Sequence, residues 1–417
     1  MELPQLASFL GVVLATVLFL KAVLRRRRRR QYNLPPGPKP WPIIGNLNLI
    51  GTLPHRSIHA LSKQYGPLMQ LQFGSFPVVV GSSVEMAKFF LKTHDVVFTD
   101  RPKTAAGRYT TYNYSDITWS PYGAYWRQAR KMCLTELFSA KRLESYEYIR
   151  REEVLALLGD LYRGGAGRVV VLKDYLSTVS LNVITRMVMG KKYLEKEVRD
   201  EAGAVITTPE EFKWMIDELF LLNGVLNIGD SIPWLDWMDL QGYIKRMKKL
   251  SKMFDRFLEH VVDEHSERRR REGESFVVKD MVDVLLQFAS DPGLEVKLNR
   301  EGVKAFTQDL IAGGTESSAV TVEWALSELL KKPEVLAKAT EELDRVVGRG
   351  RWVTEKDILG LKVIQVSLAN LLHGFTWRLP DGVELSMEEI FGLSTPRKFP
   401  LEAVVEPKLP AHLYAEA

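Results

Sequence analysis

Two adjacent glycines followed by an acid and two hydroxyl side chains form the most unusual stretch of this sequence. Residues 311–319 read IAGGTESSA, and the apolar pattern continues beyond them through Val322 to Leu329. Each glycine inside a helix costs about 1 kcal/mol relative to alanine, so a helix break is one explanation. The unbroken apolar periodicity favours the other, which is one long helix over 300–332 with a locally open groove.

The groups at this groove are suited to moving protons. Gly313 and Gly314 lack side chains, so a flat ligand can approach the backbone beside them. Glu316 and Ser317 then offer a carboxyl and a hydroxyl group, which can deliver protons to a bound oxygen species. We therefore take Glu316 and Ser317 as the candidate catalytic residues and the two glycines as the floor of a binding groove.

A second cluster lies at the start of another predicted helix, where residues 126–131 read WRQARK. Positions i and i+4 share one face of a helix, so the indole N–H of Trp126 and the guanidinium of Arg130 can grip a carboxylate together. The alternative is an arginine stacked on a surface tryptophan, which needs no ligand. The sequence by itself leaves both interpretations open.

The sequence contains one cysteine, Cys133, within the run RKMCLTELFS. A single cysteine excludes a disulfide framework within the chain and a multi-cysteine zinc site, and it fits a body that faces the cytosol. His55 and His59 have helical i, i+4 spacing, but no acid lies at the position that a metalloprotease helix needs. We expect Cys133 to be a small core residue and predict no protein ligand for a metal.

The N-terminal segment has the pattern of a membrane anchor. Leu3–Leu20 carries no charge and is about the minimum length for one bilayer crossing. Lys21 and the six arginines Arg25–Arg30 follow it, which marks the cytosolic side of the span. A cleaved signal peptide would have its charges before the apolar core. The arginine run could also bind nucleic acid, but beside a span it is a topology signal, and we predict no nucleic-acid partner.

Three domains follow from these patterns. Residues 1–30 are the predicted anchor with its basic flank, and the proline-rich residues 31–46 form a stiff hinge because proline forbids a helix there. Residues 47–417 are the body, which is mainly α-helical with a small β-sheet. A hairpin is predicted at 70–80, and Arg268–Arg271 are predicted to lie in a solvated loop. Helices are predicted over 82–92, 122–137, 140–160, 177–189, 241–271, 300–332, 333–347 and 363–373.

Together these stretches resemble the microsomal cytochrome P-450 family, in particular its plant A-type members of the flavonoid 3'-monooxygenase-like and terpenoid-oxidising group. The resemblance covers nearly the whole chain. Its motifs are the anchor, PPGPKPWPIIGN at 35–46, FTDRP at 98–102, WRQAR at 126–130, AGGTESS at 312–318, WALSELLKKPEVLAKATEELDRVVG at 324–348, and LLHGFTWRLPDG and FGLSTPRKFPL near the C-terminus.

The resemblance implies a cytochrome P-450 fold around haem b, with O2 as oxidant and electrons from NADPH through NADPH-cytochrome P-450 reductase. By their motifs, Trp126 and Arg130 would contact a haem propionate, and Gly313 and Gly314 would lie over the haem face. Glu316 and Ser317 would take the acid and hydroxyl places of the oxygen-activating groove. The resemblance also implies an endoplasmic reticulum membrane protein, with lipid around its single span, that oxidises a small lipophilic plant secondary metabolite.

The same resemblance exposes a missing segment. The family's axial iron ligand is a cysteine in a Phe-x-x-Gly-x-Arg-x-Cys-x-Gly loop near the C-terminus, and this sequence has no such loop. Up to Ile358 the chain matches the run that leads into the family's Glu-x-x-Arg helix. From Leu359 it matches the helix after the ligand cysteine. We therefore predict an incomplete fold with an internal deletion at about 358/359 that removes the axial cysteine.

Two functional hypotheses result. In the first, the gene encodes a haem-thiolate monooxygenase and this chain is an inactive form of it. In the second, the chain is a non-catalytic, membrane-anchored product without haem, such as a splice form or a gene-model artefact.

Overall fold

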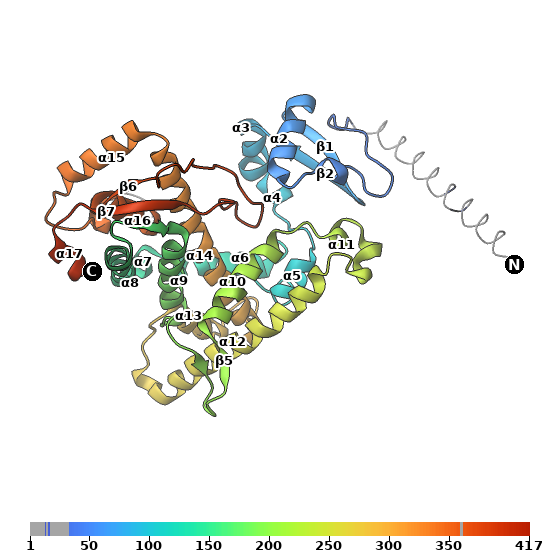
Figure 1. Cartoon of the computed structure of the whole chain (residues 1–417). Coiled ribbons are helices and arrows are strands. Elements are labelled where there is room, and N and C mark those ends of the chain that lie inside the picture. The colour runs from blue at the N-terminus through green and yellow to red at the C-terminus, as the bar shows by residue number, and fades with distance from the viewer. Residues whose placement is uncertain (1–12, 14–15, 17–32, 359–361) are drawn as a thin grey trace. The chain divides into compact units, whose positions relative to one another are not determined.

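The structure is a computed structural model that describes Val13, Thr16, residues 33–358 and residues 362–417 (Figure 1). The predicted anchor and its basic flank, and the residues just after the predicted joint, lie outside this part. No helix in the described part is both long and apolar enough to cross a membrane. The chain divides into two units, one with the residues up to Asp100 and Asn227–Gln241, the other with Arg101–Leu226 and Gly242–Ala417.

The first unit contains a β-hairpin. β1 (Leu68–Phe73) pairs antiparallel with β2 (Phe76–Gly81) in the register Phe73 to Phe76. Gly74 in the turn has φ of +53°, a conformation open to glycine. The hairpin predicted at 70–80 is confirmed. The unit's other elements are η1 (Leu47–Leu49), α2 (Pro54–Tyr65), α3 (Val84–Lys88), η2 (Phe89–Thr93), α4 (Asp95–Phe98), α11 (Ile228–Ser231) and η5 (Pro233–Met238).

The second unit is organised around α14 (Arg300–Leu330), a single unbroken helix. This confirms the prediction of one long helix across the two glycines. Figure 1 shows α14 beside α9 (Leu172–Met189), its most extensive partner. The other helices of this unit are α5 (Ala105–Thr110), α6 (Ala124–Met132), η3 (Cys133–Leu137), α7 (Ala140–Ser145), α8 (Glu147–Asp160), η4 (Leu161–Gly165), α10 (Pro209–Gly224), α12 (Tyr243–Glu272), η6 (Gly273–Ser275), α13 (Met281–Ala289), α15 (Pro333–Val346), η7 (Glu355–Asp357), α16 (Lys362–Gly374) and α17 (Ala411–Ala415).

The strands of the second unit form two small sheets. β3 (Val169–Val171), β7 (Glu402–Pro407) and β6 (Phe375–Arg378) are antiparallel in that order, and β4 (Val198–Arg199) pairs with β5 (Val205–Thr207). The mainly helical class is therefore confirmed. We predicted one small sheet, but the described residues contain three. The hairpin of the first unit is a sheet by itself, because its strands pair with neither of the two sheets of the second unit.

Some helix predictions need correction. The helix predicted over 140–160 is interrupted at Tyr146. Helix α10 was not predicted, although Thr208 and Glu211 form a capping box around Pro209 in the first turn. The prediction of a solvated loop at Arg268–Arg271 is wrong, because these residues form the last turn of α12.

Arg268 belongs to a buried cluster of charges where the end of α12 meets the start of α13. Nε2 of His265 lies 3.0 Å from Oδ2 of Asp280, and its Nδ1 lies 2.7 Å from the Val261 carbonyl oxygen. Arg268 forms an ion pair with Asp283, and both aspartates are fully buried. Burial, the largest single influence, lowers the pKa of His265, but the hydrogen bond to Asp280, the charges of Asp280 and Asp283 and the bond to the Val261 carbonyl oxygen together raise it. Arg268 thus offsets the charge of Asp283, and His265 offsets that of Asp280 when its imidazole is protonated.

Candidate functional site

A stripe of small side chains crosses the largely buried helix α14. Between residues 302 and 327 its exposed positions are Gly313, Ser317 and Thr321, at i, i+4 and i+8. A Cβ built on Gly313 would have no atom within 4 Å. The Ser317 hydroxyl donates to the Gly313 carbonyl oxygen at 2.8 Å, and the Thr321 hydroxyl donates to the Ser317 carbonyl oxygen at 2.7 Å. A flat group can therefore approach the helix backbone along this stripe, and Ser317 provides a hydroxyl there.

Glu316 lies next to this stripe and is half-buried. Burial raises the pKa of Glu316, and the Ser394 hydroxyl and the Lys173 ammonium act in the opposite direction. A raised pKa brings a carboxyl closer to the pH at which it can both hold and release a proton. The position and the chemistry of Glu316 are thus compatible with proton delivery.

Gly314 lies on a different side of the helix from Gly313. A Cβ at Gly314 would lie 2.5 Å from Cδ1 and 3.1 Å from Cβ of Ile184 on α9. Contacts that short do not occur between real atoms, so Gly314 is needed for the close packing of the two helices. The adjacent glycines therefore differ in role, with Gly313 at the open stripe and Gly314 at a helix–helix contact.

Trp126 and Arg130 lie on one face of α6, as their spacing predicts. The Trp126 indole N–H donates to the Ile117 carbonyl oxygen at 3.2 Å, and the Arg130 guanidinium lies 5.4 Å from the centre of the Trp126 ring. The structure therefore has the stacked arrangement, with the indole N–H bonded to the protein backbone. Among the described residues Arg130 forms no ion pair.

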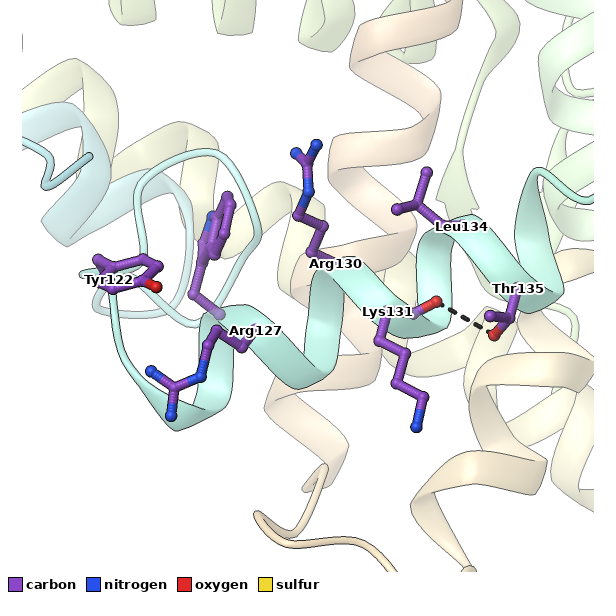
Figure 2. A pocket seen from close by; sticks show the side chains of 7 residues that line it. Tyr122, Arg127, Arg130, Lys131, Leu134 and Thr135 are labelled. Carbon is purple, nitrogen blue, oxygen red and sulfur yellow. Dashed lines mark hydrogen bonds between the residues drawn. The ribbon is translucent and has the colours of Figure 1, made fainter. Parts of the chain in front are cut away.

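An open groove of about 310 Å³ adjoins this pair. Its lining residues are Tyr122, Trp126, Arg127, Arg130, Lys131, Leu134 and Thr135. Figure 2 shows that the Arg130 side chain points away from those of Arg127 and Lys131. The three cations of this groove thus do not converge on one point.

Cys133 begins η3, directly after α6, and is 6% exposed. Burial and the negative charge of Asp309 raise the pKa of its thiol to about 11, which the Arg130 charge only partly opposes. The side chain is therefore an uncharged thiol in the core at neutral pH, as expected for a small packing residue.

Sequence reasoning missed a pair of acids that meet beside the stripe. Asp309 lies one helical turn before Gly313, and Asp116 lies in the loop before α6. The one signal available was an acid inside the otherwise apolar run of α14. Its partner, 193 positions earlier in the sequence, carried no such signal.

Comparisons with known proteins agree with these features. The sequence model of the Cytochrome P450 family matches residues 35–372. Trimethyltridecatetraene synthase of Zea mays is 39% identical over 531 residues, covering 97% of this chain and 95% of that protein. Dimethylnonatriene synthase of Zea mays is 39% identical over 526 residues, with 98% and 97% covered. Flavonoid 3'-monooxygenase of Petunia hybrida is 39% identical over 390 residues, with 92% and 73% covered.

Both the extent of the family match and the coverage of these plant relatives are decisive. Together with a mainly helical fold built around a long helix that carries Gly313, Glu316 and Ser317, they show that the chain belongs to the cytochrome P450 family.

Proposed function

We propose that this chain is an internally shortened cytochrome P450 that does not hold haem iron through a thiolate. The complete gene product would be a haem-thiolate monooxygenase that oxidises a small lipophilic plant secondary metabolite with O2 and electrons from NADPH through the reductase. The observation that carries the proposal is the cysteine content, because the one cysteine is Cys133.

The residues of this chain do not fit a thiolate-ligated haem. An axial thiolate must be deprotonated and must face the iron, whereas Cys133 is a buried thiol with a pKa of about 11. The Trp126 indole N–H, which would bind a propionate, donates to the Ile117 carbonyl oxygen. The open stripe of α14 could still lie against a flat group, so part of a binding surface is present without its metal ligand.

The alignment lengths support an internal deletion. The two maize relatives align over 531 and 526 positions, whereas this chain has 417 residues, so part of each relative faces no residue of this chain. The first unit also has uncovered apolar surface. From Val84 to Phe98 no residue is buried, and Val84 and Leu91 are 81% and 79% exposed. Apolar surface of this kind normally has a partner, which a missing segment would explain.

The membrane placement is part of the proposal. The uncharged run Leu3–Leu20 and the arginines behind it support a single span with the body in the cytosol. Membership of the family supports an endoplasmic reticulum membrane as the location and NADPH-cytochrome P-450 reductase as the partner.

A reduced carbon monoxide difference spectrum of the chain expressed with haem supplied tests the proposal. We expect no band of a thiolate-ligated ferrous complex, because the single thiol is buried and protonated. The matched control is Cys133→Ala, which should give the same spectrum as the natural chain. A thiolate band in the natural chain that disappears in Cys133→Ala would show that Cys133 binds the iron and would overturn the proposal.

A folded, non-catalytic product is the second candidate, and the region flanking the joint favours it. Asn370 accepts from the Val353 N–H at 2.9 Å and donates to the Val353 carbonyl oxygen at 3.0 Å, across the predicted joint. Arg150 and Glu355 form a nearly buried ion pair just before it. The two sides of the joint thus pack together. Sequencing the transcript across Ile358 and Leu359 would show whether such a product is made; a transcript with the intervening segment present throughout would count against it.

A further inference from the structure

Asp309 on α14 fastens the loop that precedes α6. Its Oδ2 accepts hydrogen bonds from the Ile117 N–H at 3.0 Å, the Thr118 N–H at 3.1 Å and the Thr118 hydroxyl at 3.1 Å. A carboxylate that receives three donors from two adjacent residues fixes the position of that backbone. Because Asp309 lies four residues before Gly313, the fastened loop borders the open stripe of α14.

Asp116, in the same loop, has no exposed surface. Its Oδ1 accepts from the Trp119 N–H at 3.2 Å, but its Oδ2 has no donor among the described residues. A charged carboxylate oxygen that is buried without a donor is destabilised, and a second negative charge beside it destabilises it further. Protonation removes both penalties, because the acid can then donate to the free oxygen of Asp309.

We propose that Asp116 and Asp309 share one proton and that this proton latches the loop at 115–120 onto α14 beside the open stripe. With the proton present, the pair has one negative charge, which the loop's own N–H groups stabilise. When the proton leaves, two carboxylates face each other in a buried site, and the loop, which carries Asp116, moves away from α14. Access to the stripe thus depends on one proton, whether or not haem is bound.

Within the described part of the chain, no ion pair joins Asp116 or Asp309 to a cation. Tyr125 of α6 donates to the Ser115 carbonyl oxygen at 2.6 Å, and burial raises the pKa of its phenol further above the ordinary value, so it stays neutral. Cys133 of η3 also stays neutral. The cations nearby bind elsewhere: Arg101 donates to the Thr118 carbonyl oxygen at 3.1 Å, and Arg130 stacks on Trp126.

The backbone next to the latch is strained. Tyr112, Asn113 and Tyr114 have φ of +51°, +55° and +64°, three consecutive non-glycine residues in the left-handed region. This conformation is unfavourable for residues with a Cβ, and such strain persists only where other contacts impose it. Relief of this strain favours the open loop once the latch is lost.

The direction of the pH effect follows from both carboxyl groups. Burial and the charge of Asp309 raise the pKa of Asp116 to about 8. Burial raises the pKa of Asp309 to about 6, although the Thr118 and Ile117 donors oppose this. A carboxyl whose pKa is raised stabilises the closed loop fully below its ordinary pKa, and this contribution is lost as the pH rises through the raised value. The proton's contribution to the latch therefore declines as the pH rises toward about 8 and is absent above that value.

Hydrogen exchange of the Ile117 and Thr118 amides in the full chain, corrected for intrinsic exchange rates, tests the latch. We expect protection to fall about tenfold per pH unit between about pH 6 and pH 8, the slope for release of one proton on opening, and to level off above about pH 8, where both the closed and the open loop are deprotonated. The Phe212 amide, which bonds to the Thr208 carbonyl oxygen, reports whether the second unit as a whole remains folded.

Two variants separate the shared proton from the bonds to the backbone. In Asp116→Asn the amide donates permanently to Asp309, so protection should stay high and lose its pH dependence. In Asp309→Asn the three donors lose their carboxylate, and protection of both amides should fall at least tenfold even at pH 6.5. Flat protection in the natural chain between pH 6 and pH 8, or unchanged pH dependence in Asp116→Asn, would overturn the proposal.

Discussion

Arg268→Met is expected to lower the free energy of unfolding of the second unit by about 3–5 kcal/mol. The substitution keeps an unbranched apolar stem near the Phe276 ring but removes the cation that pairs with Asp283. Asp280 and Asp283 are both fully buried, so their charges would then face only the His265 imidazole. A buried carboxylate without its cation accounts for most of the expected loss.

Two further variants make this expectation specific. Arg270→Met, two residues along the same helix, removes an exposed arginine paired with Glu267 and should change the unfolding free energy by less than about 0.5 kcal/mol. Adding Asp283→Asn to Arg268→Met should restore most of the lost stability, because the buried charge disappears with its partner. Urea unfolding followed by circular dichroism measures all three. A loss below about 1 kcal/mol for Arg268→Met would mean that the pair is not a source of stability.

The arginine run shows how local composition can mislead. Four consecutive arginines followed by EGE fit a solvated loop, and nothing within that window indicates a buried partner. The partner lies on α13, a helix that we did not predict, whose N-cap Asp280 accepts from the Asp283 N–H. The cluster exists because the end of one helix meets the start of another. Sequence periodicity predicted α12 but neither α13 nor the meeting of the two helices.

The candidate site was predictable to the extent that it depends on one helix. The unbroken apolar pattern correctly indicated a single helix through Gly313 and Gly314. The structure adds that Gly313 faces the open stripe whereas Gly314 faces α9. This difference follows in part from the helical rotation of about 100° between adjacent residues. That Ile184 of α9 lies against Gly314 depends on how two helices cross, and the pairing of Asp116 with Asp309 depends on where a distant loop returns. Neither is encoded in a local pattern.

The two adjacent glycines offer the sharpest contrast between chemically identical substitutions. Gly314→Ala is expected to lower the free energy of unfolding of the second unit by about 1–3 kcal/mol, the usual cost of overpacking a core. Its new Cβ would lie 2.5 Å from Cδ1 and 2.6 Å from Cγ1 of Ile184, a β-branched side chain with little freedom to move inside a helix. Urea unfolding of the full chain provides the measurement.

Gly313→Ala is the matched control, because its Cβ would meet nothing within 4 Å. Alanine restricts the unfolded chain more than glycine, so this variant should gain about 0.5–1 kcal/mol. Combining Gly314→Ala with Ile184→Ala should cost less than the sum of the two single changes, because the second substitution removes the atoms that the first one meets. Equal effects of the two alanines would contradict the assignment of Gly314 to the contact with α9 and of Gly313 to the open stripe. A loss of stability for Gly314→Ala together with a gain for Gly313→Ala would instead support the assignment of Gly314 to helix packing and of Gly313 to the open stripe.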